Sequence, residues 1–321
     1  MNMRNHKGRK SFIVIILGIF MIFFILASCG KDEQTDSLQN VYIAGAGASQ
    51  QGSPNTFAKL WKNGKTQILP TTGSQAFAKS VFVSGDDVYV AGFALNLQNK
   101  YVAMVWKNGI PQNLTNGIYS GYATTVYVYE GDVYVAGWEY FEEYSYSSIA
   151  RLWKNGVSQN LQDSLAYNGG AEGVFVSGGD VYIAGSKIWK NSKVLYNFSA
   201  SAIFVSNNDV YVVGCDTWKN GEILYNNGGH SIFVQGNDVY VTGCAILNGK
   251  EIATLWKNGV AQYLTDGTND ACAESVYVSG NDVYVVGHED NYGLKLWKNG
   301  VSQEFPNREL WKSEYSCLFV K

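Results

Sequence analysis

The chain has 321 residues, of which 46% are apolar and 14% aromatic, so it can bury the core of one large or two ordinary domains. Its formal net charge is −3 and its basic residues form no stripe, which argues against nucleic acid as a partner. It contains 35 Gly, 22 Tyr and only 4 Pro, a mixture typical of many short strands joined by tight turns.

Residues 1–28 have the pattern of an export signal. A positively charged stretch precedes an apolar run at 12–26, and its charges are Arg4, Lys7, Arg9 and Lys10. A run of this length also suits a transmembrane anchor. However, LASC at 26–29 resembles the lipobox of bacterial lipoproteins, which implies cleavage before Cys29 and acylation of this cysteine. We therefore expect Cys29 to attach the protein to a lipid membrane.

Residues 29–39 are polar and lack periodicity, which is typical of a flexible tether. Lys31, Asp32 and Glu33 resemble the signal that directs lipoproteins to the cell surface in Bacteroidetes-type bacteria. An ordinary solvated linker has the same composition. The resemblance predicts an outer-membrane protein exposed at the surface.

From residue 40 onward, three short patterns each recur seven times. One pattern has the form SVFVS and begins at residues 80, 125, 173, 202, 231, 275 and 317. Another has the form VYVAG and begins at residues 41, 88, 133, 181, 210, 239 and 283. The third is Trp-Lys-Asn, usually followed by Gly, and a weaker apolar run comes after it. Each pattern has the length and composition of a strand, and Asn-Gly is a strong hairpin signal.

Each repeat therefore reads as four antiparallel strands, a, b, c and d, in chain order. Seven such units predict an all-β fold, a seven-bladed β-propeller over residues 40–321. The first repeat lacks strand a, whereas the C-terminal segment 317–321 is a strand a with nothing after it. We expect this segment to complete the first blade and to close the ring, which removes exposed sheet edges.

The repeats resemble those of β-propeller proteins in general. They lack the Gly-His and Trp-Asp signature, the kelch Gly-Gly doublet and the Ser-x-Asp-x-Gly-x-Thr-Trp box of the sialidases. The resemblance is thus to a propeller lipoprotein with VYVAG and WKNG repeats, and it implies no activity.

The recurring tryptophans fall at one position of strand c. They are Trp61, Trp106, Trp153, Trp189, Trp218, Trp256 and Trp297. A large ring that recurs once per blade is most simply a wedge between neighbouring sheets. The alternative is a lectin with one sugar site per blade. We favour the structural role, and we expect the Asp before strand b to be a turn residue for the same reason.

All variation in connection length falls in the b–c and d–a connections, which lie on one face of a propeller. Loops on a rigid scaffold are where binding concentrates. The longest b–c connection is 138–149, and aromatic residues gather there and on the neighbouring blade. We predict ligand binding by Tyr101, Tyr122, Trp138, Tyr140, Phe141, Tyr144 and Tyr146. Alternatively, these rings cover the ends of the blades.

The mouth of the central channel is a second candidate site. The position three residues before the aromatic residue of each strand a gives a polar ring of Lys79, Thr124, Glu172, Ser201, His230, Glu274 and Ser316. We include Lys79, Glu172, His230 and Glu274 among the predicted ligand-binding residues, with a solvated rim as the alternative.

Four cysteines besides Cys29 lie in the repeats, and an exported protein permits disulfides between them. Cys215 and Cys244 both follow the strand-b Gly in consecutive blades, so we favour a Cys215–Cys244 bridge over free thiols. The chain has three His and no metal-binding motif, so we expect no metal and no cofactor.

These patterns favour a lipid-anchored, monomeric, non-enzymatic protein that binds a glycan or a protein through its variable loops. One alternative is a glycan hydrolase or lyase that uses Glu172 and Glu274, which would need a carboxylate separation of roughly 5–10 Å for a glycosidase. Another is a structural subunit of an envelope complex.

Overall fold

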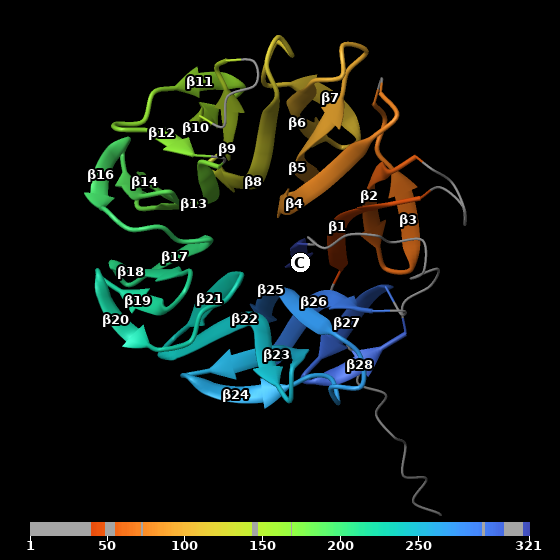
Figure 1. Cartoon of the computed structure of the whole chain (residues 1–321), viewed down its shortest axis with the longest axis vertical. Helices are drawn as coiled ribbons and strands as arrows, with labels where there is room; N and C mark the ends of the chain where they lie inside the picture. Colours follow the sequence, from red (N-terminus) through yellow and green to blue (C-terminus); the bar gives the residue numbers. More distant parts are fainter. Residues whose placement is uncertain are drawn as a thin grey trace, which may run out of the picture. The chain divides into compact units, whose positions relative to one another are not determined.

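Seven antiparallel sheets form a ring in the computed structural model (Figure 1). The structure describes residues 40–48, 55–71, 73–142, 147–167, 169–290, 293–304 and 317–321. These ranges contain strands and turns, and none of their residues forms a helix long and apolar enough to span a membrane. The predicted all-β, seven-bladed propeller of four-stranded blades is confirmed.

Each blade runs from an inner strand a to an outer strand d. Blades 1 to 4 are β29(Cys317–Val320)-β1(Val41–Gly47)-β2(Phe57–Lys62)-β3(Lys65–Ile68); β4(Ala76–Ser84)-β5(Asp87–Leu95)-β6(Tyr101–Lys107)-β7(Ile110–Asn113); β8(Gly121–Tyr129)-β9(Asp132–Tyr140)-β10(Ser147–Lys154)-β11(Val157–Gln159), with β12(Leu165–Tyr167) also paired to β10; and β13(Ala171–Ser177)-β14(Asp180–Gly185)-β15(Ile188–Lys190)-β16(Lys193–Tyr196). Blades 5 to 7 are β17(Ala202–Ser206)-β18(Asp209–Val213)-β19(Thr217–Lys219)-β20(Glu222–Tyr225); β21(Ser231–Gln235)-β22(Asp238–Leu247)-β23(Lys250–Lys257)-β24(Val260–Tyr263); and β25(Ala271–Ser279)-β26(Asp282–Glu289)-β27(Gly293–Lys298)-β28(Val301–Gln303).

The C-terminal strand closes the ring as predicted. β29 pairs antiparallel with β1, with Val41 opposite Val320, and its end lies near the centre of the ring (Figure 1). Two backbone hydrogen bonds of 2.9 Å between Asn40 and Lys321 continue the pairing. The first blade therefore joins the two ends of the repeat region.

Aromatic side chains of strand a form a closed ring around the axis. Each contacts the next with centroid separations of 4.6–5.0 Å, and the members are Phe82, Tyr127, Phe175, Phe204, Phe233, Tyr277 and Phe319. Tilted contacts at this separation are favourable for aromatic pairs. The ring couples every blade to both neighbours, including the closing strand β29.

The repeated tryptophans wedge between blades. Trp106 of blade 2 is fully buried against Leu60 and Leu69 of blade 1, and its Nε1 donates a 2.9 Å hydrogen bond to Pro70 O. Trp61, Trp153, Trp189 and Trp297 are also at most 7% exposed. The predicted structural role is therefore confirmed for these positions, whereas Trp218 and Trp256 remain half-buried.

The face that carries the a–b and c–d turns, called the turn face below, repeats one polar cluster. In blade 2, Asn108 has φ 51°, its Oδ1 accepts from Val88 N at 2.8 Å, and its Nδ2 donates to Asp87 Oδ1 at 2.7 Å. Lys107 Nζ lies 2.7 Å from Asp87 Oδ2 and 5.3 Å from the centroid of the Tyr89 ring. Blades 3 to 7 repeat these contacts, and in blade 1 Asn40 replaces the Asp. The Lys-Asn-Gly sequence thus ties strand c to strand b.

The opposite face, called the mouth face below, is uneven because the b–c hairpins differ in length. In the segment 138–149, predicted as a loop, residues 138–140 and 147–149 are strand: Tyr140 pairs with Ser148, and Trp138 with Ala150. Blade 6 has a comparable extension that reaches Leu247 and Lys250. In blades 4 and 5, by contrast, β14 ends at Gly185 and β18 ends at Val213. The mouth face is therefore low over blades 4 and 5.

Candidate functional site

A pocket of about 930 Å³ occupies this low part of the mouth face. Short hairpins of blades 4 and 5 provide its floor. On one side it is bordered by Ala166 and Tyr167 of β12, and on the other by Ile246 and Glu251 of the extended blade 6 hairpin. Its volume is within the range of pockets that bind small ligands.

The predicted channel-mouth residues are placed by β-bulges. In blades 2, 3, 4 and 7 the register between strands a and b shifts across a single residue, and these residues are Lys79, Thr124, Glu172 and Glu274. A bulge re-aims a side chain and is common next to functional sites. Ser201 and His230 occupy the same position just before β17 and β21, while Ser316 lies outside the described residues.

The glycine of the VYVAG pattern is required by this bulge. A Cβ at Gly137 would lie 1.9 Å from the carbonyl oxygen of Tyr122, on the neighbouring strand a. Equivalent Cβ atoms at Gly92, Gly185 and Gly287 would lie 1.9–2.0 Å from a carbonyl oxygen. Only glycine permits such a close backbone approach. Sequence reasoning missed this role, although the recurrence of Gly at one strand position was the signal.

Three of the predicted mouth residues line the pocket: Glu172, Ser201 and His230. Withdrawal from water raises the pKa of the Glu172 carboxyl to about 7, and the positive charge of Lys79 opposes this shift. With a pKa of about 7, Glu172 can exchange protons near neutral pH.

Thr124, by contrast, has a structural role, because its Oγ1 lies 3.0 Å from Ala136 O and 2.9 Å from Ala171 O.

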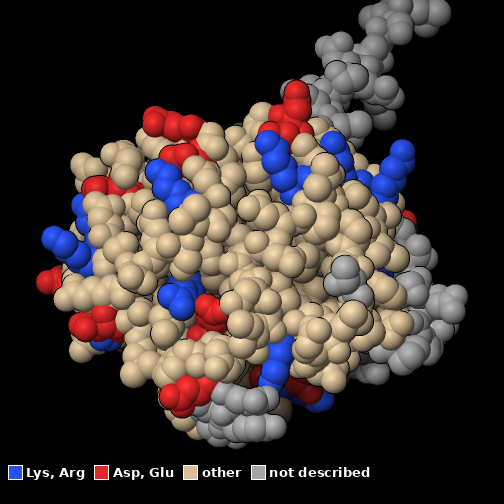
Figure 2. All heavy atoms as spheres, turned by 90° about the horizontal axis from the view of Figure 1, so that it is seen from above, with Lys and Arg blue, Asp and Glu red and all other residues tan. Residues whose placement is uncertain are grey.

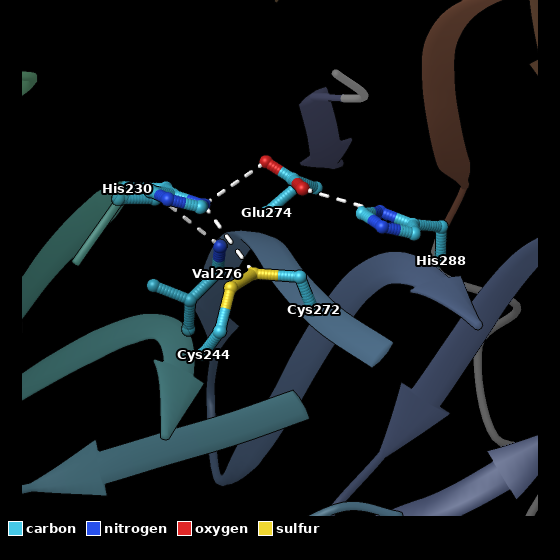
Figure 3. Close-up of polar contacts among 7 residues, drawn as sticks. His230, Cys244, Cys272, Glu274, Val276 and His288 are labelled. Carbon is cyan, nitrogen blue, oxygen red and sulfur yellow. Dashed lines mark hydrogen bonds and ion pairs between the residues drawn. A yellow bond between two sulfur atoms is a disulfide. The ribbon is translucent and has the colours of Figure 1, made fainter. Parts of the chain in front are cut away.

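Glu274 is held between two imidazoles (Figure 3). His230 Nδ1 lies 3.1 Å from Glu274 Oε2, and His288 Nδ1 lies 3.3 Å from Oε1. Burial alone would raise the pKa of Glu274, which is 7% exposed, but the two histidines outweigh burial and lower it. The hydrogen bond to Glu274 raises the pKa of His230. Glu274 is not among the pocket-lining residues, so the pair Glu172 and Glu274 does not meet in this pocket.

The predicted aromatic residues of blades 2 and 3 form one continuous ridge. The rings of Tyr101 and Tyr122 are 5.4 Å apart, Tyr122 stacks on Trp138 at 5.1 Å, and Tyr140 meets Tyr122 edge-on at 6.1 Å. Burial of the Tyr122 ring raises the pKa of its hydroxyl to about 12. Phe141 is half-buried. These rings cover the blade ends, and none of them is among the residues that line the pocket, although Trp138 Cβ lies beside the lining residue Gly170.

Two further predicted residues, Tyr144 and Tyr146, lie outside the described residues, as does the predicted lipidation site Cys29. Two aromatic residues that were not predicted to bind ligand do line the pocket. Tyr167 is 77% exposed, and Trp256 is the one recurring tryptophan that reaches the pocket wall. Trp256 packs against the core cluster that contains Val213 of blade 5 and Val241 of blade 6, so its place at the pocket depends on a neighbouring blade and not on the local sequence.

The predicted Cys215–Cys244 bridge is wrong. Cys244 is bonded to Cys272, with a Cα–Cα distance of 4.8 Å, and Cys215 is free and exposed. The segment with Gly228 and Gly229 separates the ends of β18 and β22, since Cβ atoms there would meet Cys215 O at 2.5 Å and Thr242 O at 2.4 Å. The inner strand β25 of blade 7 instead packs directly against β22. Comparison of equivalent strand-b positions could not show this contact.

His230 approaches this disulfide, with Nδ1 3.7 Å from Cys272 Sγ (Figure 3). The ligand atoms of His230, Cys244 and Cys272 lie within 4.8 Å of one another, a spacing that a metal ion could bridge. In this structure the two sulfurs are bonded to each other and offer no thiolate. The cluster was not predicted as a unit, because His230 and Cys244 belong to blade 6 whereas Cys272 comes from the inner strand of blade 7.

No protein-family model matches the chain, and no curated protein matches it. Among solved structures, the chain is similar to a Bacteroides fragilis protein named as a 6-phosphogluconolactonase, with 12% sequence identity and a TM-score of 0.49. The similarity covers 90% of this chain and 99% of that one.

Proposed function

We propose that this propeller is a lipid-anchored binding protein of the bacterial envelope that holds a glycan in the mouth-face pocket. The observation that carries the proposal is the pocket itself, about 930 Å³ in volume, between Tyr167 of blade 3 and the hairpin of blade 6. The pocket lies where variable connections meet a rigid ring, which is where propellers offer a binding surface.

The lining suits a sugar chain. Its polar side chains include Ser186, Ser199, Ser201, Asn226 and Asn227. Tyr167 and Trp256 add flat apolar faces on which a sugar ring can stack. Figure 2 shows the ring from its edge, where positive and negative side chains are interspersed.

The anchor is the part of the proposal that rests on sequence. The lipobox at 26–29 supports acylation of Cys29, and the polar segment 30–39 would separate the propeller from the membrane. Mass spectrometry of the full chain from its native host should show an N-terminal, acylated Cys29. An unprocessed chain that begins at Met1 would contradict the anchor.

The binding test uses the full chain in detergent on a broad panel of immobilised glycans, followed by titration of any hit. We expect Tyr167→Ala to weaken binding about tenfold, the loss of roughly 1.4 kcal/mol of stacking energy. Tyr263→Ala is the matched control, because Tyr263 is also exposed at 53% but lies on the outer strand β24, outside the pocket lining. Equal effects of both changes, or no bound glycan, would contradict the proposal.

A glycan-degrading enzyme is a second candidate, favoured by one observation. The pKa of Glu172 at about 7 suits a general acid or base in the pocket. The same panel tests it: released sugar fragments that disappear with Glu172→Gln would indicate catalysis, whereas binding without release would reject it.

A further inference from the structure

The disulfide of blades 6 and 7 is unequally accessible. Cys244 is half-buried and lines the pocket, whereas Cys272 is 2% exposed. A molecule in the pocket can therefore reach the sulfur of Cys244 and not that of Cys272. If the bond is attacked at Cys244, Cys272 must be the leaving group.

The leaving sulfur has a proton donor in place. His230 Nδ1 lies 3.7 Å from Cys272 Sγ and 3.1 Å from Glu274 Oε2, so its N–H is within reach of both (Figure 3). Glu274 in turn contacts His288, which fixes the carboxylate. An imidazolium next to a sulfur stabilises the thiolate, and a stabilised thiolate leaves faster. A disulfide that only joins two blades requires none of these neighbours.

We propose that Cys244–Cys272 is a thiol-exchange site whose substrates are small thiols or thiol-bearing peptides that enter the mouth-face pocket. The incoming thiolate forms a bond to Cys244 Sγ while the Cys244–Cys272 bond breaks. The electron pair of that bond passes to Cys272 Sγ, which takes the proton from His230 Nδ1. A second substrate thiol then attacks the mixed disulfide, which leaves Cys244 and Cys272 as thiols and the substrate as its own disulfide.

This inference does not depend on glycan binding, since it concerns the wall of the pocket at blades 6 and 7.

The test uses glutathione as the probe, with the full chain in detergent and with Cys215→Ser in every variant to remove the exposed free thiol. Reactions are stopped with acid and mapped by mass spectrometry. We expect the mixed disulfide on Cys244 and not on Cys272. We also expect His230→Gln to lower the exchange rate about tenfold, the effect of a leaving thiol whose pKa is no longer lowered.

Tyr263→Ala is the control, because Tyr263 lies on the outer strand β24, outside the pocket lining. We expect its rate to stay within about twofold of the parent. A disulfide that reacts only after the protein is denatured, glutathione on Cys272, or equal rates for His230→Gln and the parent would each overturn the proposal.

The pH profile gives a measurement that does not depend on any variant. The groups that face His230 are Glu274 and Cys272 of β25, His288 of β26 and Glu251 of β23. After correction for the thiolate fraction of glutathione, we expect the rate to fall as the pH rises above the pKa of His230, which is raised from 6.5. A corrected rate that is flat between about pH 6 and pH 9 would contradict a role for the His230 proton.

Discussion

The turn face and the mouth face are built on the same strands but differ in how their residues recur. On the turn face, blades 2 to 7 each place the same Lys, Asp and Asn in the same contacts, as the cluster of Lys107, Asp87 and Asn108 shows. On the mouth face, the equivalent positions after the strand-b glycine carry Phe93, Trp138, Ser186, Cys215, Cys244 and His288. One face repeats its side chains, and the other repeats only its backbone.

The difference indicates what each face must do. The turn-face cluster makes the same hydrogen bonds and ion pairs in the hairpins of blades 2 to 7, so the same residues recur. The mouth face keeps a bulge and a glycine in blades 2, 3, 4 and 7, which fixes where the side chains point but leaves their chemistry free. A scaffold of this kind can change ligand without a change of fold.

The largest predicted effect concerns the backbone that the mouth face does repeat. In Gly137→Ala the new Cβ would meet Tyr122 O at 1.9 Å, and both atoms belong to paired strands of one blade. We expect the free energy of unfolding to fall by roughly 3 kcal/mol, because neither strand can move without breaking its ladder. Chemical denaturation of the purified protein measures this change.

Gly169→Ala is the control for this prediction. Gly169 is also on the mouth face, but a Cβ there has no atom within 4 Å and its φ is not positive. We expect a change of less than about 0.5 kcal/mol. If both variants lose the same stability, the close approach at the bulge is not what requires glycine.

The repeats made most of the fold predictable. Period-two strands, Asn-Gly turns and the missing first strand a led directly to seven blades with closure by 317–320, because these are local signals. The wedge role of Trp106 followed from recurrence alone. The polar mouth positions also followed from counting along strand a, although the bulge that explains them did not.

The site was less predictable because it depends on contacts between blades. The pocket exists where two short hairpins lie between two long ones, and segment 138–149 was predicted as a loop although residues 138–140 and 147–149 are strand. The Cys244–Cys272 bond joins β22 to β25, which no comparison of equivalent repeat positions reveals. Neighbour contacts across a curved ring are not a property of any single repeat.

A second, intermediate effect is expected on the turn face. Asn108 combines a positive φ of 51° with hydrogen bonds to Val88 N and Asp87. Asn108→Ala loses both hydrogen bonds and strains the backbone, so we expect the free energy of unfolding to fall by about 2 kcal/mol. Asn108→Gly keeps the conformation and loses only the side-chain hydrogen bonds, so the free energy of unfolding should fall by about half as much.

Thermal denaturation of the two variants, together with unchanged glycan binding and thiol exchange, checks this prediction. A loss of mouth-face binding in Asn108→Ala at temperatures where the protein is folded would show that the two faces are coupled. Equal stability of the Ala and Gly variants would show that the hydrogen bonds, and not the turn conformation, carry the effect.

The smallest predicted effect is a pH-dependent gain in stability when Glu172 on the mouth face is replaced by Gln. The pKa of Glu172 is about 7 in the folded protein against an ordinary value of 4.5, so the folded state binds the proton more tightly. Its contribution to stability is therefore fully present below about pH 4.5 and is lost as the pH rises to about 7. Glu172→Gln cannot ionise, and we expect it to be more stable than the parent by roughly 1–2 kcal/mol at pH 8, with little difference at pH 4.

Lys79 sharpens this test, because its charge lowers the pKa of Glu172. In Lys79→Met the pKa of Glu172 should rise further, so stability should be lost up to a higher pH than in the parent. Urea denaturation across the pH range measures both variants. If Glu172→Gln is destabilised equally at pH 4 and pH 8, the carboxyl is a fixed structural acceptor of the ring. If the gain appears only above the pKa of Glu172, the bulge of blade 4 holds at the pocket wall a carboxyl that lowers stability when it is ionised. Such a position is expected to serve binding or proton transfer and not stability.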